Sequence, residues 1–339
     1  MVDAPSLRVV FFGTPAFAVP TLDALLASPH RVVGVVTQPD RPRGRGQQVV
    51  DAPVKARAVA VGLRVLQPDR LKDPTFVASL RALESDVGVV AAYGRILTDD
   101  MLAIPRLGMI NVHASLLPKY RGAAPVHRAV IAGDAETGVT IMRVVKALDA
   151  GPMLAAATRP IGPDETSEVV ERDLAQIGAR LLVATLDAVA AGRGVEVAQD
   201  DRAATYAPRV TKEDGVVDWT QSAQAIHNRI RGLHPWPHVS AFVNGRRLIL
   251  LRSACQPSAS QVPAECQPGA SQVPAKCQPG ASQVPGTIVE AHGDRLAVAT
   301  GDGVLLLLTV QPEGKRPMSA REFLAGRSIA VGDRFAPSA

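Results

Sequence analysis

The sequence predicts an α/β fold, in which a doubly wound, mostly parallel sheet is followed by a small β-barrel. Apolar, strand-like runs alternate with helix-like segments over residues 7–190, an order typical of parallel sheets. The runs are apolar almost throughout, as expected for strands that are covered on both faces. After residue 237 the pattern changes to short strand-like segments with turns at Asn244-Gly245 and Gly301-Asp-Gly303, which favours a barrel.

Apolar periodicity and the positions of Gly and Pro set the expected elements of the sheet. Strands are expected at residues 7–12, 31–37, 63–66, 86–92, 109–112 and 136–145, the last followed by a turn at 148–152. Helices are expected at residues 16–27, 51–61, 74–83, 126–132 and 166–190. Ligands of such sheets bind beyond the carboxyl ends of the strands, where Tyr93-Gly94 and Asn111-x-His113 fall.

The second half contains the expected barrel and an unusual repeat. A helix is expected at residues 223–231, and strands at 239–243, 247–251, 295–300 and 304–309. Residues 255–287 are three tandem copies of one unit, CQPSASQVPAE, CQPGASQVPAK and CQPGASQVPGT. Their Pro, Ser, Gln and Ala content predicts a disordered insertion between two strands. Cys255, Cys266 and Cys277 occur once per copy, which favours duplication over a zinc site or a disulfide.

Composition bounds the organisation of the chain. Its 339 residues suit two domains, expected at 1–195 and 209–339 with a polar linker at 196–208. No apolar run reaches 18 residues and no signal peptide is evident, so a cytoplasmic protein without a membrane partner is expected. Residues 206–339 carry 14 Lys and Arg against 10 Asp and Glu, a basic balance that fits a polyanion such as nucleic acid.

The turn after the first strand excludes the usual ligands of this fold. It reads Gly13-Thr-Pro-Ala-Phe-Ala, with one glycine and a proline where a dinucleotide fingerprint needs G-x-G-x-x-G. No G-x-x-x-x-G-K-[S/T] motif occurs in the chain. Nicotinamide cofactors and nucleoside triphosphates are therefore poor candidates.

The stretch 108–125 holds the strongest candidate site. Strand side chains alternate, so Asn111 and His113 face the same side at the strand end. An amide donor and an imidazole suit acyl transfer to an amine, and Asp149 in the next turn is the expected partner of His113. No serine or cysteine nucleophile is required, because Ser115 lacks the Gly-x-Ser-x-Gly elbow. The alternative is structural: a buried histidine, a turn-forming asparagine and an Asx turn at Asp149.

Residues 38–46 are too rich in Pro, Gly and Arg for a regular element and predict a loop that carries Arg41, Arg43 and Arg45. The loop is either a solvated basic surface or one that gathers phosphates of a bound RNA.

The stretch 108–125 resembles the folate-dependent formyltransferases, through G-x-I-N-V-H-A-S-L-L-P and Y-R-G-A-A-P. Further stretches are similar to the members of this family that act on aminoacyl-tRNA. They lie at residues 12–15, 37–42, 44–46, 92–94, 133–140, 148–151, 207–214, 218–219, 234–237 and 285–288. The resemblance spans nearly the whole chain. It departs from the family pattern at the repeats and at His234, where Asn is usual.

The resemblance implies a Rossmann-like catalytic domain and an OB-like, tRNA-binding domain. It implies formyl transfer from 10-formyltetrahydrofolate to the α-amine of methionyl initiator tRNA, by a monomeric, bacterial-type enzyme without a metal. The family's catalytic Asn, His and Asp fall on Asn111, His113 and Asp149. Its folate site falls on Ser115, Leu116, Leu117 and Pro118, with the pterin near Tyr93 and Leu97. Its tRNA contacts fall on Arg41, Arg43 and Arg45, with Lys212 and Arg246 as candidates in the second domain.

Two alternatives remain open. One is a formyltransferase of the same fold that acts on a small amine, such as an amino sugar nucleotide or a glycinamide. The other is a noncatalytic tRNA-binding protein. The basic second domain and the Arg loop argue against the first, and the complete set of Asn111, His113 and Asp149 argues against the second.

Overall fold

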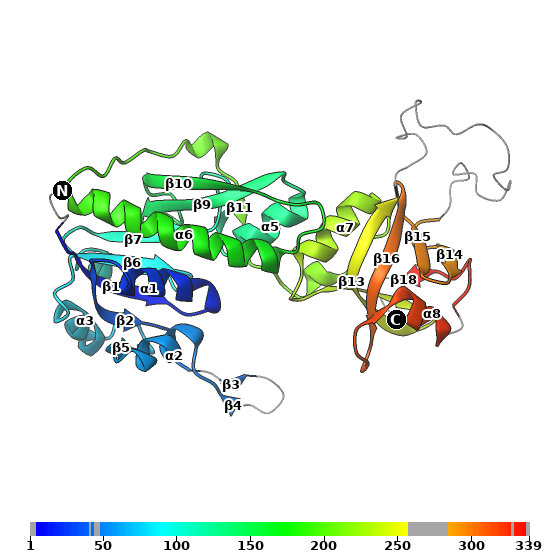
Figure 1. Ribbon diagram of the computed structural model, residues 1–339, viewed down its shortest axis with the longest axis horizontal. Helices are drawn as coiled ribbons and strands as arrows, with labels where there is room; N and C mark the ends of the chain where they lie inside the picture. Colours follow the sequence, from blue (N-terminus) through cyan, green and yellow to red (C-terminus); the bar gives the residue numbers. More distant parts are fainter. Residues whose placement is uncertain (1–4, 41, 44–47, 257–283, 327–328, 337–339) are drawn as a thin grey trace. The chain divides into compact units, whose positions relative to one another are not determined.

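The structure is a computed structural model that describes residues 5–40, 42–43, 48–256, 284–326 and 329–336 (Figure 1). The chain forms two compact units. The first comprises residues 1–126, 135–161 and 169–209, and the second comprises 127–134, 162–168 and 210–339. In the described parts of the chain, no helix is long and apolar enough to span a membrane.

A seven-stranded sheet forms the centre of the first unit (Figure 1). Its strands are β1 (Arg8–Gly13), β2 (Arg31–Val36), β5 (Val65–Leu66), β6 (Val87–Ala91), β7 (Met109–His113), β9 (Glu136–Arg143) and β10 (Met153–Pro160). Their order is β10-β9-β7-β6-β1-β2-β5. The pairs among β7, β6, β1, β2 and β5 are parallel, which confirms the doubly wound, mostly parallel prediction.

The edge formed by β9 and β10 differs from a purely parallel sheet. β9 pairs antiparallel with β7, and β10 pairs antiparallel with β9. β10 was not expected: its sequence, MLAAATRP, is rich in Ala and lacks the Val and Ile of the inner strands, and its side chains are half-buried or exposed. An edge strand with one solvated face needs no such run.

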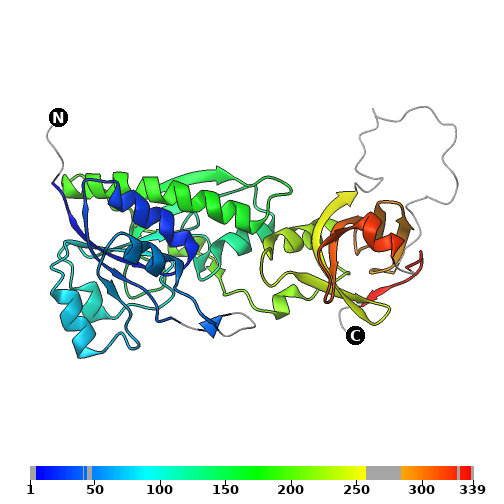
Figure 2. The same ribbon diagram turned by 60° about the horizontal axis from the view of Figure 1, so that its bottom comes forward.

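Helices cover both faces of this sheet. They are α1 (Val19–Leu26), α2 (Pro53–Ala60), α3 (Pro74–Arg81), α4 (Asp99–Leu102) and α6 (Ser167–Ala190), with the short helix η1 (Ala16–Ala18). Most of a further helix, α5 (Pro125–Ala132), belongs to the second unit. α3 and α4 pack on the face that carries Val10, Phe12 and Val36. α1 and α6 lie side by side on the other face (Figures 1 and 2). There α6 approaches β7 and β9 closely, since a Cβ on Gly178 would lie 2.7 Å from Val112 Cγ1.

The segment 196–208, expected as a linker, is a structured part of the first unit. Val197 forms a β-bridge with Met153, and Glu196 pairs with Arg143 across 2.7 Å. The segment continues through η2 (Asp201–Ala203) to β11 (Tyr206–Ala207), which pairs in parallel with β8 (Arg121–Gly122). The polar composition of this segment thus reflects hydrogen bonding to the sheet's edge.

The second unit contains an antiparallel sheet that curls into a barrel. Its strands are β12 (Val239–Val243), β13 (Arg246–Gln256), β14 (Ile288–His292), β15 (Arg295–Ala299), β16 (Val304–Pro312), β17 (Met318–Ser319) and β18 (Phe335–Ala336). The order is β14-β15-β16-β13-β12-β18, and a bridge between Thr287 and Arg334 brings the two edges together. Besides most of α5, this unit contains the helices η3 (Glu213–Gly215), α7 (Ala223–Gly232) and α8 (Ala320–Ala325). The predicted small barrel is confirmed.

The tandem repeats lie between β13 and β14, as predicted. Cys255 and Gln256 belong to β13, where they pair with Leu305 and Val304 of β16. The predicted insertion is therefore too long at its first end and also at its last, since Gly286 and Thr287 are hydrogen-bonded to Ala299 of β15. Residues 257–283, with Cys266 and Cys277, lie outside the described residues.

Candidate functional site

Asn111 and His113 lie on one face at the carboxyl end of β7, as the alternation of side chains predicted. Val112 between them points to the opposite face, toward α6. His113 is buried to 5% exposure, whereas Asn111 is half-buried. The side-chain amide of Asn111 has no hydrogen-bond partner among the described residues, so it is available to a ligand.

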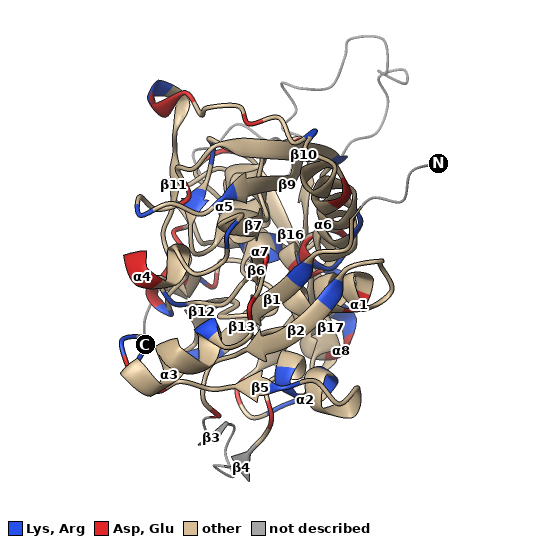
Figure 3. Cartoon of the chain, turned by 90° about the vertical axis from the view of Figure 1, so that its left-hand side faces the viewer, with Lys and Arg blue, Asp and Glu red and all other residues tan. Residues whose placement is uncertain are grey.

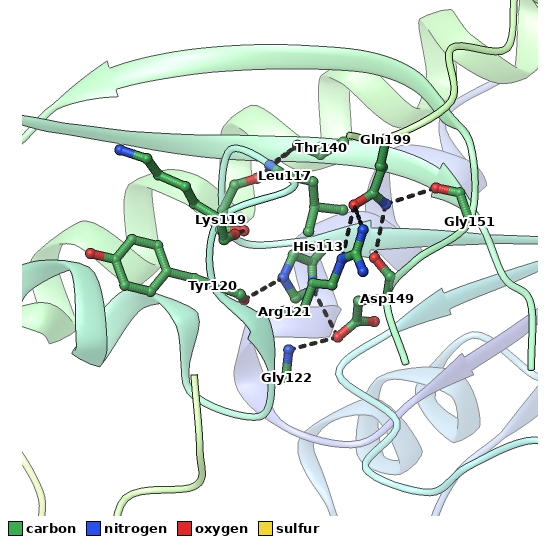
Figure 4. A network of polar contacts seen from close by, with 11 residues as sticks. His113, Leu117, Lys119, Tyr120, Arg121, Gly122, Thr140, Asp149, Gly151 and Gln199 are labelled. Carbon is green, nitrogen blue, oxygen red and sulfur yellow. Dashed lines mark hydrogen bonds and ion pairs between the residues drawn. The ribbon is translucent and has the colours of Figure 1, made fainter. Parts of the chain in front are cut away.

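His113 is held by groups on two sides (Figure 4). Nε2 lies 3.0 Å from the carbonyl oxygen of Tyr120, and Nδ1 lies 3.8 Å from Asp149 Oδ2. Because a carbonyl only accepts hydrogen bonds, we assign the proton of the neutral ring to Nε2. Nδ1 then presents its lone pair toward Asp149, and a proton taken up at Nδ1 would lie beside a carboxylate.

Asp149 lies near His113 as predicted, but the chain path that brings it there differs from the predicted one. The sequence argument placed the two residues together because neighbouring parallel strands end at the same edge, but β9 is antiparallel to β7. The loop between β9 and β10 instead folds back along β7. A Cβ on Gly151 would overlap the Arg143 carbonyl, and Asp149 itself has a positive φ of 48°. Gly122 N–H donates to Asp149 Oδ2 across 2.8 Å.

Two functional candidates that the sequence did not reveal, Gln199 and Arg121, complete this cluster (Figure 4). Gln199 Nε2 lies 2.8 Å from the carbonyl oxygens of both Asp149 and Gly151. Its Oε1 accepts from Arg121 Nε and Nη2, at 3.0 and 2.8 Å. Gln199 belongs to the expected linker, and no local pattern marks it.

The segment predicted to bind folate is a tightly bonded turn. Ser115 is fully buried, and its hydroxyl donates to the Lys119 carbonyl across 2.7 Å. Thr140 Oγ1 donates to the Ser115 carbonyl and accepts from Leu117 N–H, at 2.7 and 3.1 Å. Leu117 is buried, while Leu116 and Pro118 are half-buried. The Ser115 hydroxyl is thus committed to the turn, and a ligand could contact this segment through its backbone and its apolar side chains.

The two residues predicted near the pterin differ in exposure. The Tyr93 ring is 1% exposed and packs edge-on against Phe12, with ring centroids 5.6 Å apart. Burial raises the pKa of the Tyr93 hydroxyl to about 12, and this hydroxyl has no hydrogen-bond partner in the described structure. The Tyr93 carbonyl accepts from Gln38 Nε2 across 2.7 Å. Leu97 is half-buried. The Tyr93 side chain is therefore part of the core rather than of an open surface.

The predicted tRNA contacts are described only in part. Arg41 and Arg45 lie outside the described residues, and Arg43 belongs to β3 (Pro42–Arg43), which pairs with β4 (Gln48–Val49). The start of this loop is fixed by Asp40, which accepts from Lys55 of α2 and from Gln67. These bonds hold the pKa of the Asp40 carboxyl below its usual range. α2 is basic, whereas α4 begins with two aspartates (Figure 3).

Lys212 and Arg246, the candidates in the second unit, are both exposed. Arg246 follows the Asn244-Gly245 turn and lines a cavity of about 480 Å³ together with Arg247, Leu248 and Phe323. No three His, Cys, Asp or Glu side chains of the described residues gather into a group that could hold a metal ion.

Comparisons with known proteins match both halves of the chain. Residues 7–186 match the formyl transferase family, and residues 209–328 match the formyl transferase C-terminal domain. The methionyl-tRNA formyltransferase of Roseiflexus sp. (strain RS-1) is 46% identical, over 97% of this chain and 95% of its own. The methionyl-tRNA formyltransferase of Heliobacterium modesticaldum is also 46% identical, over 97% of this chain and 100% of its own.

Solved structures share the fold at low identity. The N-formyltransferase from Helicobacter canadensis, in complex with folinic acid and dTDP-3-aminofucose, has a TM-score of 0.63 at 15% identity, covering 90% of this chain and 99% of its own. HypX from Aquifex aeolicus, in complex with tetrahydrofolic acid, has a TM-score of 0.60 at 14% identity. It covers 94% of this chain, which spans 47% of HypX.

Proposed function

This chain belongs to the formyl transferase family, and we propose that it formylates the α-amine of methionyl initiator tRNA with 10-formyltetrahydrofolate as donor. The observation that carries the proposal is the 46% identity, over almost the full length of both chains, to methionyl-tRNA formyltransferases. The described site supports it, because an unpartnered amide, an imidazole and a carboxylate converge at the end of β7.

In the proposed reaction the amine nitrogen bonds to the formyl carbon, and the bond from that carbon to the donor nitrogen breaks. The donor supplies a formyl group on a nitrogen that can leave. Asn111 donates its amide N–H to the formyl oxygen as that oxygen gains charge. His113 Nδ1 takes the proton that the amine loses and returns it to the leaving nitrogen, while Asp149 pairs with the protonated ring. Nε2 stays bonded to Tyr120 throughout, which fixes the ring.

The donor and the tRNA are assigned to different parts of the chain. We propose that the donor lies against the 115–118 turn and Leu97, since these residues adjoin the strand ends where such sheets bind ligands. We assign the tRNA to Arg41, Arg43 and Arg45, with Lys212 and Arg246 as contacts in the second unit. The protein is expected to act as a cytoplasmic monomer in a bacterium, where charged initiator tRNA is available.

The test is formyl transfer by the purified protein from 10-formyltetrahydrofolate to charged initiator tRNA. Formylation of the methionyl α-amine is the expected result. A nucleotide-linked amino sugar is offered in parallel as the competing acceptor. If the sugar amine is formylated while the tRNA stays unmodified, the proposed substrate is wrong and the small-amine alternative is correct. If the tRNA binds and neither acceptor is formylated, the protein is a noncatalytic tRNA-binding protein.

A further inference from the structure

We propose that Gln199 is a positioning residue for formyl transfer, which holds the Asp149 loop in place through two hydrogen bonds; this proposal rests on the proposed function. The side-chain amide of Gln199 bridges the carbonyls of Asp149 and Gly151, each at 2.8 Å (Figure 4). One carbonyl belongs to Asp149, whose carboxylate lies 3.8 Å from His113 Nδ1, and the other lies two residues further along the same loop. Gln199 touches neither His113 nor the carboxylate in the described contacts, so it acts through the loop.

The chemistry of its neighbours fixes which way the Gln199 amide points. The Arg121 guanidinium has donors only, so the atom that faces it at 2.8 and 3.0 Å is the amide oxygen. The two loop carbonyl oxygens can only accept hydrogen bonds, so the atom that faces them is the amide nitrogen, which donates one hydrogen to each. Glutamine is the side chain that matches a guanidinium on one side and two carbonyls on the other.

Arg121 holds the oxygen side of the Gln199 amide in place. Its side chain is 4% exposed, and Nη2 also donates to Asp201 across 2.7 Å. Its backbone N–H donates to the Thr205 carbonyl, as part of the β8 and β11 pairing. The two neighbours of Arg121 contact the reacting cluster: the Tyr120 carbonyl accepts from His113, and Gly122 N–H donates to Asp149.

Residues 199–207 therefore hold both partners of His113 in place. The Asp149 loop needs such support, because residues 145–148 are exposed and Asp149 has a left-handed backbone conformation. Without the Gln199 donors, two loop carbonyls lose their partners, and among the described contacts the bond from Gly122 N–H is left to hold the carboxylate near Nδ1. A displacement of about 1 Å in a reacting cluster typically costs about 10²-fold in rate.

The decisive variant is Gln199→Glu, which keeps an acceptor for Arg121 and replaces the two N–H donors by an oxygen. We expect kcat for formyl transfer to fall about 10²-fold, with KM for tRNA and for the donor within about threefold. In an Asp149→Ala background the same substitution is expected to change kcat by less than about threefold, because the group it positions is already gone. Losses that multiply in the double variant would overturn the proposal.

Three further measurements complete the test. Arg202→Gln alters the same segment, but its exposed side chain contacts Asp200 and not the cluster, so kcat is expected to stay within about twofold. Hydrogen exchange over residues 144–152 is expected to rise in Gln199→Glu and to stay unchanged in the barrel; unchanged exchange over 144–152 would contradict the proposal.

Gln199→Ala is the second variant, and failure of both Gln199 variants to fold would show a structural role and overturn the proposal. If the wild-type protein formylates no tRNA, the proposed function fails, while hydrogen exchange still decides whether Gln199 holds the loop.

Discussion

Asn111 lies half-buried at the end of β7, and its side-chain amide is bonded to none of the described residues. Replacement by alanine therefore leaves no buried donor or acceptor without its partner. We expect the free energy of unfolding of Asn111→Ala to stay within about 0.5 kcal/mol of the wild type, as for substitutions that remove no packing or hydrogen bond.

The effect on the reaction is expected to be far larger. If the Asn111 amide donates to the oxygen that becomes negatively charged, its removal costs about 10²–10³ in kcat, which corresponds to about 2.7–4 kcal/mol. Because that donor acts mainly in the transition state, KM for the tRNA is expected to change by less than about threefold.

The assay is single-turnover formylation of charged initiator tRNA, together with urea denaturation of each variant. Asn111→Gln is the control, since it retains the amide and moves it by one methylene; we expect intermediate activity. Wild-type kcat in Asn111→Ala would refute the assignment of this amide to the oxyanion. A loss of more than about 2 kcal/mol of stability would show that the residue is structural.

Three further predictions concern other residues. His113→Ala is expected to abolish turnover and leave tRNA affinity within about threefold, as measured by filter binding; an equal loss of affinity would make His113 structural. Tyr93→Phe removes a buried hydroxyl that lacks a partner in the described structure, so stability in urea should be unchanged or up to about 1–2 kcal/mol higher; a raised KM for the donor would instead show that the hydroxyl binds it. Ser319 N–H, and then Arg316, lowers the pKa of Glu322 to about 2, so its stabilisation of α8 is complete above about pH 5 and is lost as pH falls through 2. The stability difference between the wild type and Glu322→Ala should shrink steadily over that window. A difference as large at about pH 2 as at about pH 6 would contradict the capping role.

Local patterns predicted the inner strands of the large sheet, most of its helices and the shared face of Asn111 and His113, because alternation and periodicity depend on neighbouring residues. They missed α4, β10, β14 and α8. They predicted Asp149 near His113 for the wrong reason. An antiparallel β9 carries its end away from His113, and the loop returns with Gly151 lying against the Arg143 carbonyl, where a side chain would not fit. This close approach is formed only when the chain folds, and its sign in the sequence is a single glycine, Gly151.

Gln199 could not be found in this way, because its partners are remote in sequence. It bonds Asp149 and Gly151, 50 and 48 residues away, and Arg121, 78 residues away. A polar stretch with turn-forming residues has the same composition whether it is a solvated connection or is bonded along a sheet's edge. Tyr93 shows a different error: its place at a strand end predicted a site residue, but its ring points into the core.

The pairing of β11 with β8 also sets the moment during synthesis at which the cluster around His113 is complete. When the ribosome has added residue 195, every strand of the large sheet exists, and so do Asn111, His113 and Asp149. Gln199 and the segment that fixes Tyr120 and Gly122 are still missing. The residues that form the sheet are therefore synthesised before those that support its reactive groups. A fragment that ends at Ala207, beyond the last residue of α6, includes all of the residues named in these contacts.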